Sequence, residues 1–242
     1  YHVVRFLCEK NEQIEVFVYD PDDRGGYNKD MISLIKGVTP NVEIYSNDDL
    51  KNNNIREHIR GLNIELGVLA WWPFIISEDL IQLTKRGFVN THPGYLPYNR
   101  GKHPYFWCLV DNTPFGVTLH YVDKDIDHGQ IIAQREIPFT WIDTGETLYE
   151  RSREEILKLF YEHFDSIKCG TAKTTSQLNV EGTIHYGNQL ESFCTIDLEK
   201  EYKAKTLLNI CRGRMFNGQG KANFTDGEKE YVISIFIQEK SE

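Results

Sequence analysis

The residues best suited to do chemistry in this chain are an amide, an imidazole and a carboxylate. Asn90 and His92 end a short apolar segment and come directly before a polar stretch rich in proline and glycine. Side chains two positions apart on a strand share a face, so Asn90 and His92 should project together. Asp127 lies in the later loop "DKDIDHG", which can return a carboxylate to the same edge of a sheet. We therefore expect the three side chains to converge.

Such a trio could catalyse the transfer of an acyl group. A histidine titrates near neutral pH and can take a proton from an incoming nucleophile. An asparagine N–H can hold the oxygen that gains charge, and removing such a donor from another enzyme costs about 3–4 kcal/mol. An aspartate can orient the imidazole, stabilise its charged form or pass a proton to a leaving nitrogen. Because no serine or cysteine nucleophile is tied to the set, the residues favour direct acyl transfer between nitrogens, or hydrolysis.

Strands that alternate with helices should position these residues. The nearly continuous apolar run at 66–72 is typical of a strand buried on both faces, and 88–92 is the next expected strand. The alternation predicts an α/β, doubly wound, mainly parallel, Rossmann-like core, in which ligands bind at the carboxyl ends of the strands. A strand is expected before the helical pattern at 2–11, so the first strand of the core is expected to be missing. Further strands are expected at 13–20, 42–46, 115–123 and 129–139, and helices at 47–62, 77–87, 104–112 and 144–170.

The chain is expected to divide into a catalytic core and a smaller extension. Residues 1–170 form the core, 171–182 a polar linker, and 183–242 a small α+β extension. The extension should contain a helix at 197–216 and a β-hairpin at 221–238 that turns at Asp226-Gly227, since glycine readily adopts positive φ. An exposed hairpin is an aggregation hazard unless it is covered, so we expect a homodimer.

Composition excludes several classes of protein. The chain has 242 residues and a formal net charge of −9, which disfavours a large nucleic-acid-binding surface. No apolar run approaches the length that spans a bilayer, and no signal-peptide pattern is present. The five cysteines include no C-x-x-C pair, which predicts a reduced cytoplasmic protein with neither a disulfide framework nor a zinc-thiolate site. No metal is expected.

Two quoted segments resemble the folate-dependent formyltransferase family. They are "NTHPGYLPYNRGKHP" and "GVTLHYVDKDIDHGQII", which carry the family's N-x-H, L-P-x-x-R-G and G-V-T…D-x-G motifs. The match runs in order and spacing from about Leu66 to Ile132. The resemblance implies that Asn90, His92 and Asp127 are the catalytic trio and that N10-formyltetrahydrofolate is the formyl donor.

The resemblance also implies a donor pocket beside "AWWPFII" (70–76). In the family this loop offers backbone groups to the pterin ring, and the loop that contains Asp127 closes the other side. Trp71 and Trp72 could equally belong to the core, and for at least one of them packing is the favoured role. The expected donor-binding residues are Trp71, Trp72, Pro73, Phe74, Ile75, Asp123 and Ile126.

The tail from Gly182 to Phe224 resembles the short extension of sugar N-formyltransferases, which act on an amino sugar attached to a nucleoside diphosphate, commonly dTDP. This resemblance implies dTDP-4-amino-4,6-dideoxyglucose or a 3-amino analogue as acceptor, and a place in lipopolysaccharide O-antigen biosynthesis. Enzymes that formylate initiator tRNA usually carry a further barrel domain and a basic surface. The tail of this chain is too short for that domain, and the chain's net charge is negative. The glycinamide ribonucleotide enzyme has a glycine-rich phosphate loop after its first strand, and that region is missing or unlike it here.

Cationic and aromatic residues are the candidates for binding this acceptor. Arg100 and Lys102 could meet a diphosphate, and Arg is favoured for forked contacts. Arg212, Arg214 and Phe216 could bind a phosphate or a stacked base, although helix-terminal charge and a core phenylalanine explain them equally well. The full set is Tyr98, Arg100, Lys102, His103, Arg212, Arg214 and Phe216.

Three alternatives remain open. A hydrolase could release formate from formyl-folate. A metal-dependent amidohydrolase could use His92, Asp127 and His128, since a zinc hydrolase needs three protein ligands and an open position. A non-catalytic folate- or nucleotide-binding module is the third, and the intact trio speaks against it.

Overall fold

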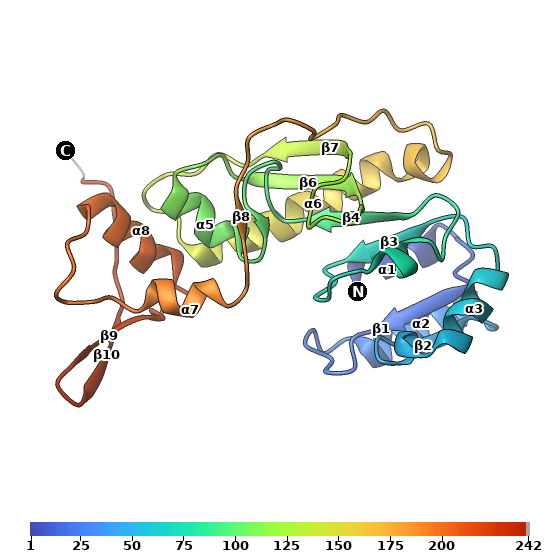
Figure 1. The fold of residues 1–242 in the computed structure, drawn as a ribbon, viewed down its shortest axis with the longest axis horizontal. Coiled ribbons are helices and arrows are strands. Elements are labelled where there is room, and N and C mark those ends of the chain that lie inside the picture. Colours follow the sequence, from blue (N-terminus) through green and yellow to red (C-terminus); the bar gives the residue numbers. More distant parts are fainter. Residues whose placement is uncertain (241–242) are drawn as a thin grey trace.

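A four-stranded sheet lies at the centre of the computed structural model, which describes residues 1–240 (Figure 1). Its strand order is β3-β4-β6-β7. Strands β3 and β4 pair in parallel, whereas β6 pairs antiparallel with both β4 and β7. The predicted α/β, Rossmann-like core is confirmed, and the strands that follow Asn90 and His92 make its sheet mixed. The four strands are β3 (Gly67–Ala70), β4 (Phe88–His92), β6 (Gly116–Tyr121) and β7 (Ile131–Glu136).

Two further parallel strands form a separate pair in the N-terminal part of the core. They are β1 (Val16–Tyr19) and β2 (Glu43–Ser46), and α2 (Asn28–Val38) connects them, as a right-handed parallel crossover requires a helix or long connection. Helix α1 (His2–Glu9) packs against α2. The sequence analysis did not identify α2, although the Asp23 carboxylate accepts hydrogen bonds from backbone N–H groups at its start.

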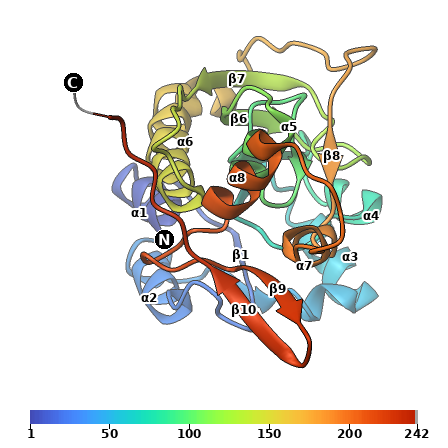
Figure 2. The ribbon, with the colours of Figure 1, turned by 90° about the vertical axis from the view of Figure 1, so that its left-hand side faces the viewer.

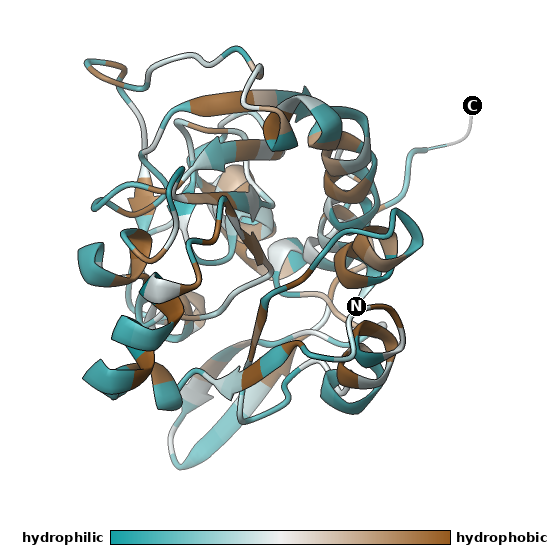
Figure 3. Ribbon diagram, turned by 90° about the vertical axis from the view of Figure 1, so that its right-hand side faces the viewer, coloured by the Kyte–Doolittle hydropathy of each residue, from teal (hydrophilic) through white to brown (hydrophobic). Residues whose placement is uncertain are grey.

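The long helix α6 (Gly145–Lys168) covers one face of the sheet. Its first turn is fixed by a capping box in which the side chains of Thr144 and Thr147 each accept a hydrogen bond from the other's backbone N–H. Its apolar face contributes Ile156 and Phe160 to the main core, which also contains Phe115, the residue before β6. The brown and teal bands in Figure 3 show that hydrophobic and hydrophilic residues alternate along the helix ribbons.

Two predicted helices are shorter than the sequence indicated. The segment 47–62 divides into the 3₁₀ turn η1 (Asp49–Lys51) and α3 (Asn53–Gly61), because the Asp49 carboxylate bonds back to the Ser46 backbone and hydroxyl. Helix α4 (Glu78–Ile81) covers only the first turn of 77–87.

The C-terminal extension packs on α5 (Pro104–Asp111), which follows the polar stretch after His92. Helix α8 (Ala204–Gly213) lies against α5, and the Asn209 amide donates to the Leu109 carbonyl at 2.5 Å. The predicted helix at 197–216 is therefore present but shorter. The predicted hairpin is β9 (Ala222–Asp226) and β10 (Lys229–Ile233), with Gly227 at φ 61°, and it projects from the body of the molecule (Figure 2). The other extension helix is α7 (Gln189–Cys194).

The chain between α6 and the extension runs back along the core. Its end forms β8 (Ile184–His185), which pairs in parallel with the two-residue strand β5 (Arg100–Gly101) (Figure 1). Thr175 makes an isolated bridge to Ile131 at the start of β7. Across the described part of the chain, residues 1–240, no helix is both long enough and apolar enough to cross a membrane.

Candidate active site

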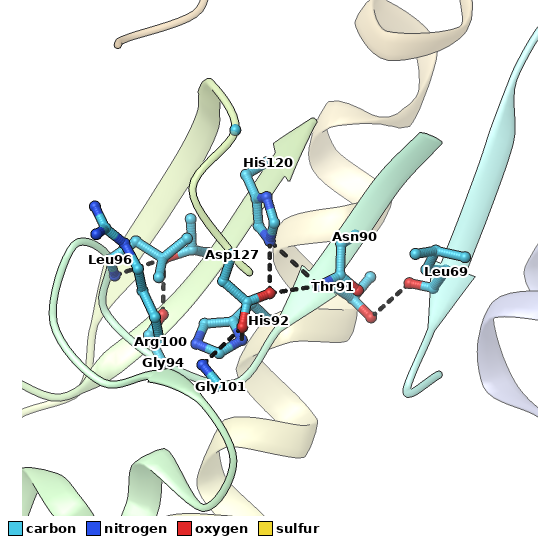
Figure 4. A network of polar contacts seen from close by, with 12 residues as sticks. Leu69, Asn90, Thr91, His92, Gly94, Leu96, Arg100, Gly101, His120 and Asp127 are labelled. Atoms are coloured by element: carbon cyan, nitrogen blue, oxygen red, sulfur yellow. Dashed lines mark hydrogen bonds and ion pairs between the residues drawn. The ribbon is translucent and has the colours of Figure 1, made fainter. Parts of the chain in front are cut away.

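Strand β4 presents the two residues that open the site. Asn90 and His92 share one face of β4, and the antiparallel register with β6 sets Asn90 opposite His120. Asp127, from the loop between β6 and β7, comes to rest between these side chains (Figure 4). The predicted convergence of an amide, an imidazole and a carboxylate is therefore present in the structure.

The Asp127 carboxylate is the hub of the cluster. Its Oδ2 accepts a hydrogen bond from the Gly101 backbone N–H at 2.8 Å and lies 3.3 Å from His92 Nδ1. Its Oδ1 accepts from Asn90 Nδ2 at 3.2 Å and lies 3.4 Å from His120 Nε2 (Figure 4). The side chain of Asp127 is only 13% exposed, so its orientation is fixed by these contacts rather than by water.

The His92 ring is buried and has an oxygen near each nitrogen. Nε2 lies 3.2 Å from the Asn99 carbonyl, and Nδ1 faces Asp127. Burial lowers the pKa of His92, and the opposing effect of the Asp127 carboxylate only partly offsets it. His92 is therefore neutral near pH 7 and able to take a proton, and the imidazolium that would form has an acceptor at both nitrogens.

Asp127 stays ionised although it is buried. Burial alone would raise the pKa of Asp127, but its pKa is lowered because His92 and the Gly101 N–H favour the carboxylate. The neutral imidazole beside an ionised carboxylate is the pairing that a general base requires.

His120 is a site residue that the sequence analysis did not consider. Its Nδ1 donates to the Tyr121 carbonyl at 2.8 Å, which leaves Nε2 as an acceptor for the Asn90 amide at 3.2 Å. The two N–H groups of Asn90 are thus directed at His120 and Asp127. The alternation of Thr118 and His120 on one strand face was the available signal, but only the register with β4 places His120 beside Asn90.

The predicted donor loop lies at the end of β3. Trp71 is 39% exposed at φ 56°, and Ile75 is 76% exposed, so apolar surface faces outward beside the cluster. Trp72 is partly buried, and its Nε1 is itself buried and has no hydrogen-bond partner, so this ring packs into the protein. The exposed apolar side chains of Trp71 and Ile75 suit a flat heteroaromatic ligand. The Phe74 ring packs against Trp72 and Arg24.

The Asp127 loop supplies the other two residues expected at the donor pocket. Asp123 is partly exposed, and its carboxylate lies 3.2 Å from His128 Nδ1. Ile126 is partly buried next to Asp127. His128 is therefore engaged with Asp123 and does not join His92 and Asp127, and in residues 1–240 no three His, Cys, Asp or Glu side chains are grouped to hold a metal ion.

The acceptor candidates of the first motif stay near the cluster. Lys102 Nζ donates to the Pro73 carbonyl at 3.0 Å, which ties the stretch after His92 to the donor loop. Arg100 is half-buried and donates to Gln177, and His103 Nδ1 lies 2.8 Å from the Tyr105 hydroxyl. Tyr98 is half-buried in the same stretch.

The three candidate acceptor-binding residues of the C-terminal extension make contacts within the protein. The buried Arg212 guanidinium donates to the Thr140 and Asp143 carbonyls, and the buried Arg214 pairs with Glu191 at 2.7 Å. Phe216 packs edge-on against Tyr105. These contacts favour the packing interpretation of the three residues over contact with a phosphate or a base.

An α/β core with an amide, an imidazole and a carboxylate grouped at the end of a central strand defines a class of proteins suited to acyl transfer. The family model described as formyl transferase matches residues 7–163, more than half of the chain. The chain therefore belongs to the formyl transferase family. A second model, the N-formyltransferase dimerization C-terminal domain, matches residues 189–239.

Individual relatives agree with this assignment. The dTDP-4-amino-4,6-dideoxyglucose formyltransferase of Mycobacterium tuberculosis is 35% identical over 156 residues, which are 63% of this chain and 65% of that protein. The chain thus spans just under two thirds of the length of this relative.

Two solved structures resemble the chain. A 4-N formyltransferase from Francisella tularensis superposes with a TM-score of 0.79 over 98% of this chain and 94% of its own, at 20% identity, which shows the shared fold. The formyltransferase PseJ from Anoxybacillus kamchatkensis, solved with UDP-4,6-dideoxy-4-formamido-L-AltNAc and tetrahydrofolate, is 28% identical; the TM-score is 0.55 over 73% of this chain and 88% of that one.

Proposed function

We propose that this protein transfers a formyl group from N10-formyltetrahydrofolate to the amine of a nucleotide-linked amino sugar. The observation that carries the proposal is the convergence of Asn90, His92 and the Asp127 carboxylate at the end of β4. Family membership supports the formyl group as the unit transferred. The preferred acceptor is dTDP-4-amino-4,6-dideoxyglucose, which the name of the Mycobacterium tuberculosis relative supports, or a 3-amino analogue.

Each of the three residues has its own role in the proposed transfer. Neutral His92 takes a proton from the acceptor amine as the nitrogen attacks the formyl carbon. One Asn90 N–H turns from Asp127 or His120 toward the carbonyl oxygen, where it and the protonated His92 stabilise the developing charge. Asp127 stabilises the imidazolium and helps pass the proton to the leaving N10 nitrogen. The new N–C bond forms first, and the C–N10 bond breaks when the tetrahedral intermediate collapses. Holding both substrates in one site supplies much of the acceleration.

The two binding surfaces are assigned by position. Trp71, Trp72, Pro73, Phe74 and Ile75 form the donor side, with Asp123 and Ile126 opposite. Tyr98, Arg100, Lys102 and His103 face the acceptor. We also propose that the molecule works as a homodimer through residues 189–239, which the match to the dimerization domain supports.

The test is a transfer assay. Purified protein with N10-formyltetrahydrofolate is offered a panel of nucleotide-linked amino sugars that differ in base and in amine position, and products are identified by mass. A formylated sugar with wild-type protein, and at least 100-fold slower formation with His92→Ala, supports the proposal. The matched control is His163→Ala, since His163 lies on α6 outside the cluster.

Each alternative has a distinct result in this assay. Formate release without an acceptor indicates a hydrolase. Activity that a strong chelator abolishes indicates the metal amidohydrolase. Tight binding of folate or nucleotide with no turnover indicates a binding module. Full turnover by His92→Ala protein would reject the assigned mechanism.

A further inference from the structure

The connection between the core and the extension makes specific contacts with the candidate active site. Residues 174–185, which we call the strap, follow α6 and end in β8. Thr175 exchanges two backbone hydrogen bonds with Ile131, at 2.8 and 2.9 Å, just beyond the Asp127 loop. The strap is therefore attached to the core before it reaches the site, and it is more than a flexible linker.

Gln177 is the strap residue that enters the site. It is 3% exposed, and its amide is fully used. Nε2 donates to the Asp127 carbonyl at 3.1 Å and to the Gly129 carbonyl at 2.7 Å. Oε1 accepts from Arg100 Nη2 at 2.9 Å and Nε at 3.3 Å. One side chain thus joins the loop that carries Asp127 to the stretch that follows His92.

The end of the strap contacts the segment whose backbone N–H binds the Asp127 carboxylate. The Thr183 and His185 carbonyls accept from the Arg100 and Lys102 N–H groups at 3.0 and 2.9 Å. Between them lies Gly101, at φ 89°, so close to the His185 carbonyl that a Cβ would collide with it. The Gly101 N–H is the donor that reaches Asp127 Oδ2.

We propose that the strap is a positioning element, and Gln177 a positioning residue, that hold the Asp127 carboxylate in register with His92. The inference rests on the proposed function and extends it to a segment outside both motifs. Asp127 has φ 49°, a conformation that non-glycine residues adopt rarely, so its loop needs external contacts to stay in place. A displacement of about 1 Å in a positioned catalytic group can cost about 100-fold in rate.

The experiment compares three variants. Gln177→Met keeps the length of the side chain and removes all four hydrogen bonds. Gln177→Glu keeps an acceptor for Arg100 but sets a carboxylate against the Asp127 and Gly129 carbonyls. Ser176→Ala is the matched control, because Ser176 is an exposed neighbour whose hydroxyl bonds only within the strap.

Two readouts are measured. The first is kcat and KM for both substrates, where we expect Gln177→Met and Gln177→Glu to lower kcat about 100-fold with little change in KM, and Ser176→Ala to match the wild type. The second is the NMR titration of His92 without substrates, in wild type, Gln177→Met and Ser176→Ala. We expect its midpoint to fall in Gln177→Met, because the carboxylate that supports the protonated ring has moved away.

The outcomes separate this inference from the proposed function. An unchanged kcat and an unchanged His92 midpoint in folded Gln177→Met overturn it. A loss of activity that only follows the folded fraction, with His92 unmoved, also overturns it, since that is a purely structural role. If Gln177→Met does not fold, wild-type kcat in Gln177→Glu overturns it. If the wild type formylates no amino sugar, the proposed function fails, while the His92 titration still decides the inference.

Discussion

At the scale of single residues, the site depends on how one carboxylate is satisfied. The Asp127 carboxylate contacts Asn90, His92, His120 and the Gly101 N–H. Each contact offsets the free energy that burial of a polar group without a partner would cost. His120 limits the rotation of Asn90, because its Nε2 accepts one of the amide N–H groups. The orientation of Asn90, the proposed oxyanion donor, therefore depends on a residue that need not touch the substrate.

Replacing the carboxylate tests its role directly. We expect Asp127→Asn to lower kcat by about 10²–10⁴, because the imidazolium loses its counterion and proton transfer loses a partner. Asp125→Asn is the control, since Asp125 is exposed in the same loop. The measurement is single-turnover formyl transfer at saturating substrates. A decrease of less than tenfold in Asp127→Asn would remove Asp127 from the mechanism.

The pH profile follows from the direction of the His92 shift. Burial lowers the pKa of His92 below its ordinary value of 6.5, so the active, neutral ring persists as the pH falls to that value. We expect kcat/KM to keep its plateau at pH 7 and to decline only below pH 6.5, and the NMR midpoint of His92 to lie below 6.5. In Asp127→Asn the midpoint should fall further, because the carboxylate favours the charged ring. A midpoint above 6.5 would contradict this assignment.

The sequence predicted the residues whose relation is local and missed those that depend on pairing. Asn90 and His92 are two positions apart on one strand. Asp127 was predicted to join them from the order and spacing of the two motifs. His120 joins them only through the β4–β6 register. Gln177 lies 50 positions from Asp127, in a polar stretch that has no pattern to mark a buried side chain. The burial of Arg212 and Arg214 likewise depends on how α8 packs, which spacing does not encode.

At the scale of elements, local capping decides where the helices begin. The long helix was expected to begin at Thr144, and in the structure Thr144 is its N-cap and forms a capping box with Thr147. The expected start at Asn47 was wrong, because Asp49 stabilises a separate turn and Asn52 caps α3 instead. Such competition between neighbouring polar side chains has several local solutions, and tertiary packing selects one.

Removal of the α6 cap should destabilise the whole core. Thr144→Ala deletes the acceptor for the Thr147 N–H, and N-cap threonines contribute about 1 kcal/mol. We expect the free energy of unfolding to fall by about that amount, with an unchanged m-value in urea. Thr171→Ala, at an exposed position beyond the C-terminal end of α6, is the control and should change stability by less than about 0.5 kcal/mol. Equal effects of the two substitutions would show that the capping box contributes nothing.

At the scale of the whole molecule, the extension leaves apolar surface uncovered on the projecting hairpin. Val232 of β10 is 63% exposed and Phe236, just beyond it, is 85% exposed. The hairpin stands clear of the core in Figure 2. An exposed strand edge with large apolar side chains is prone to aggregation in a monomer and is typical of an interaction surface. Together with the match to a dimerization domain, this favours a second copy of the chain as the group that covers it.

A single charge should therefore shift the oligomeric state. Burial of a phenylalanine contributes about 1.5–3 kcal/mol, and each protomer of a two-fold dimer loses this contact, so Phe236→Asp should weaken the dimer by about 10²–10⁴-fold. Val38→Asp is the control, since Val38 is exposed at the end of α2. Helix α2 lies far from the hairpin in Figure 1. Sedimentation velocity over a range of concentrations gives the dissociation constants. A wild-type chain that stays monomeric at tens of micromolar, or a Phe236→Asp protein that dimerises like the wild type, would show that this hairpin is not the dimer surface.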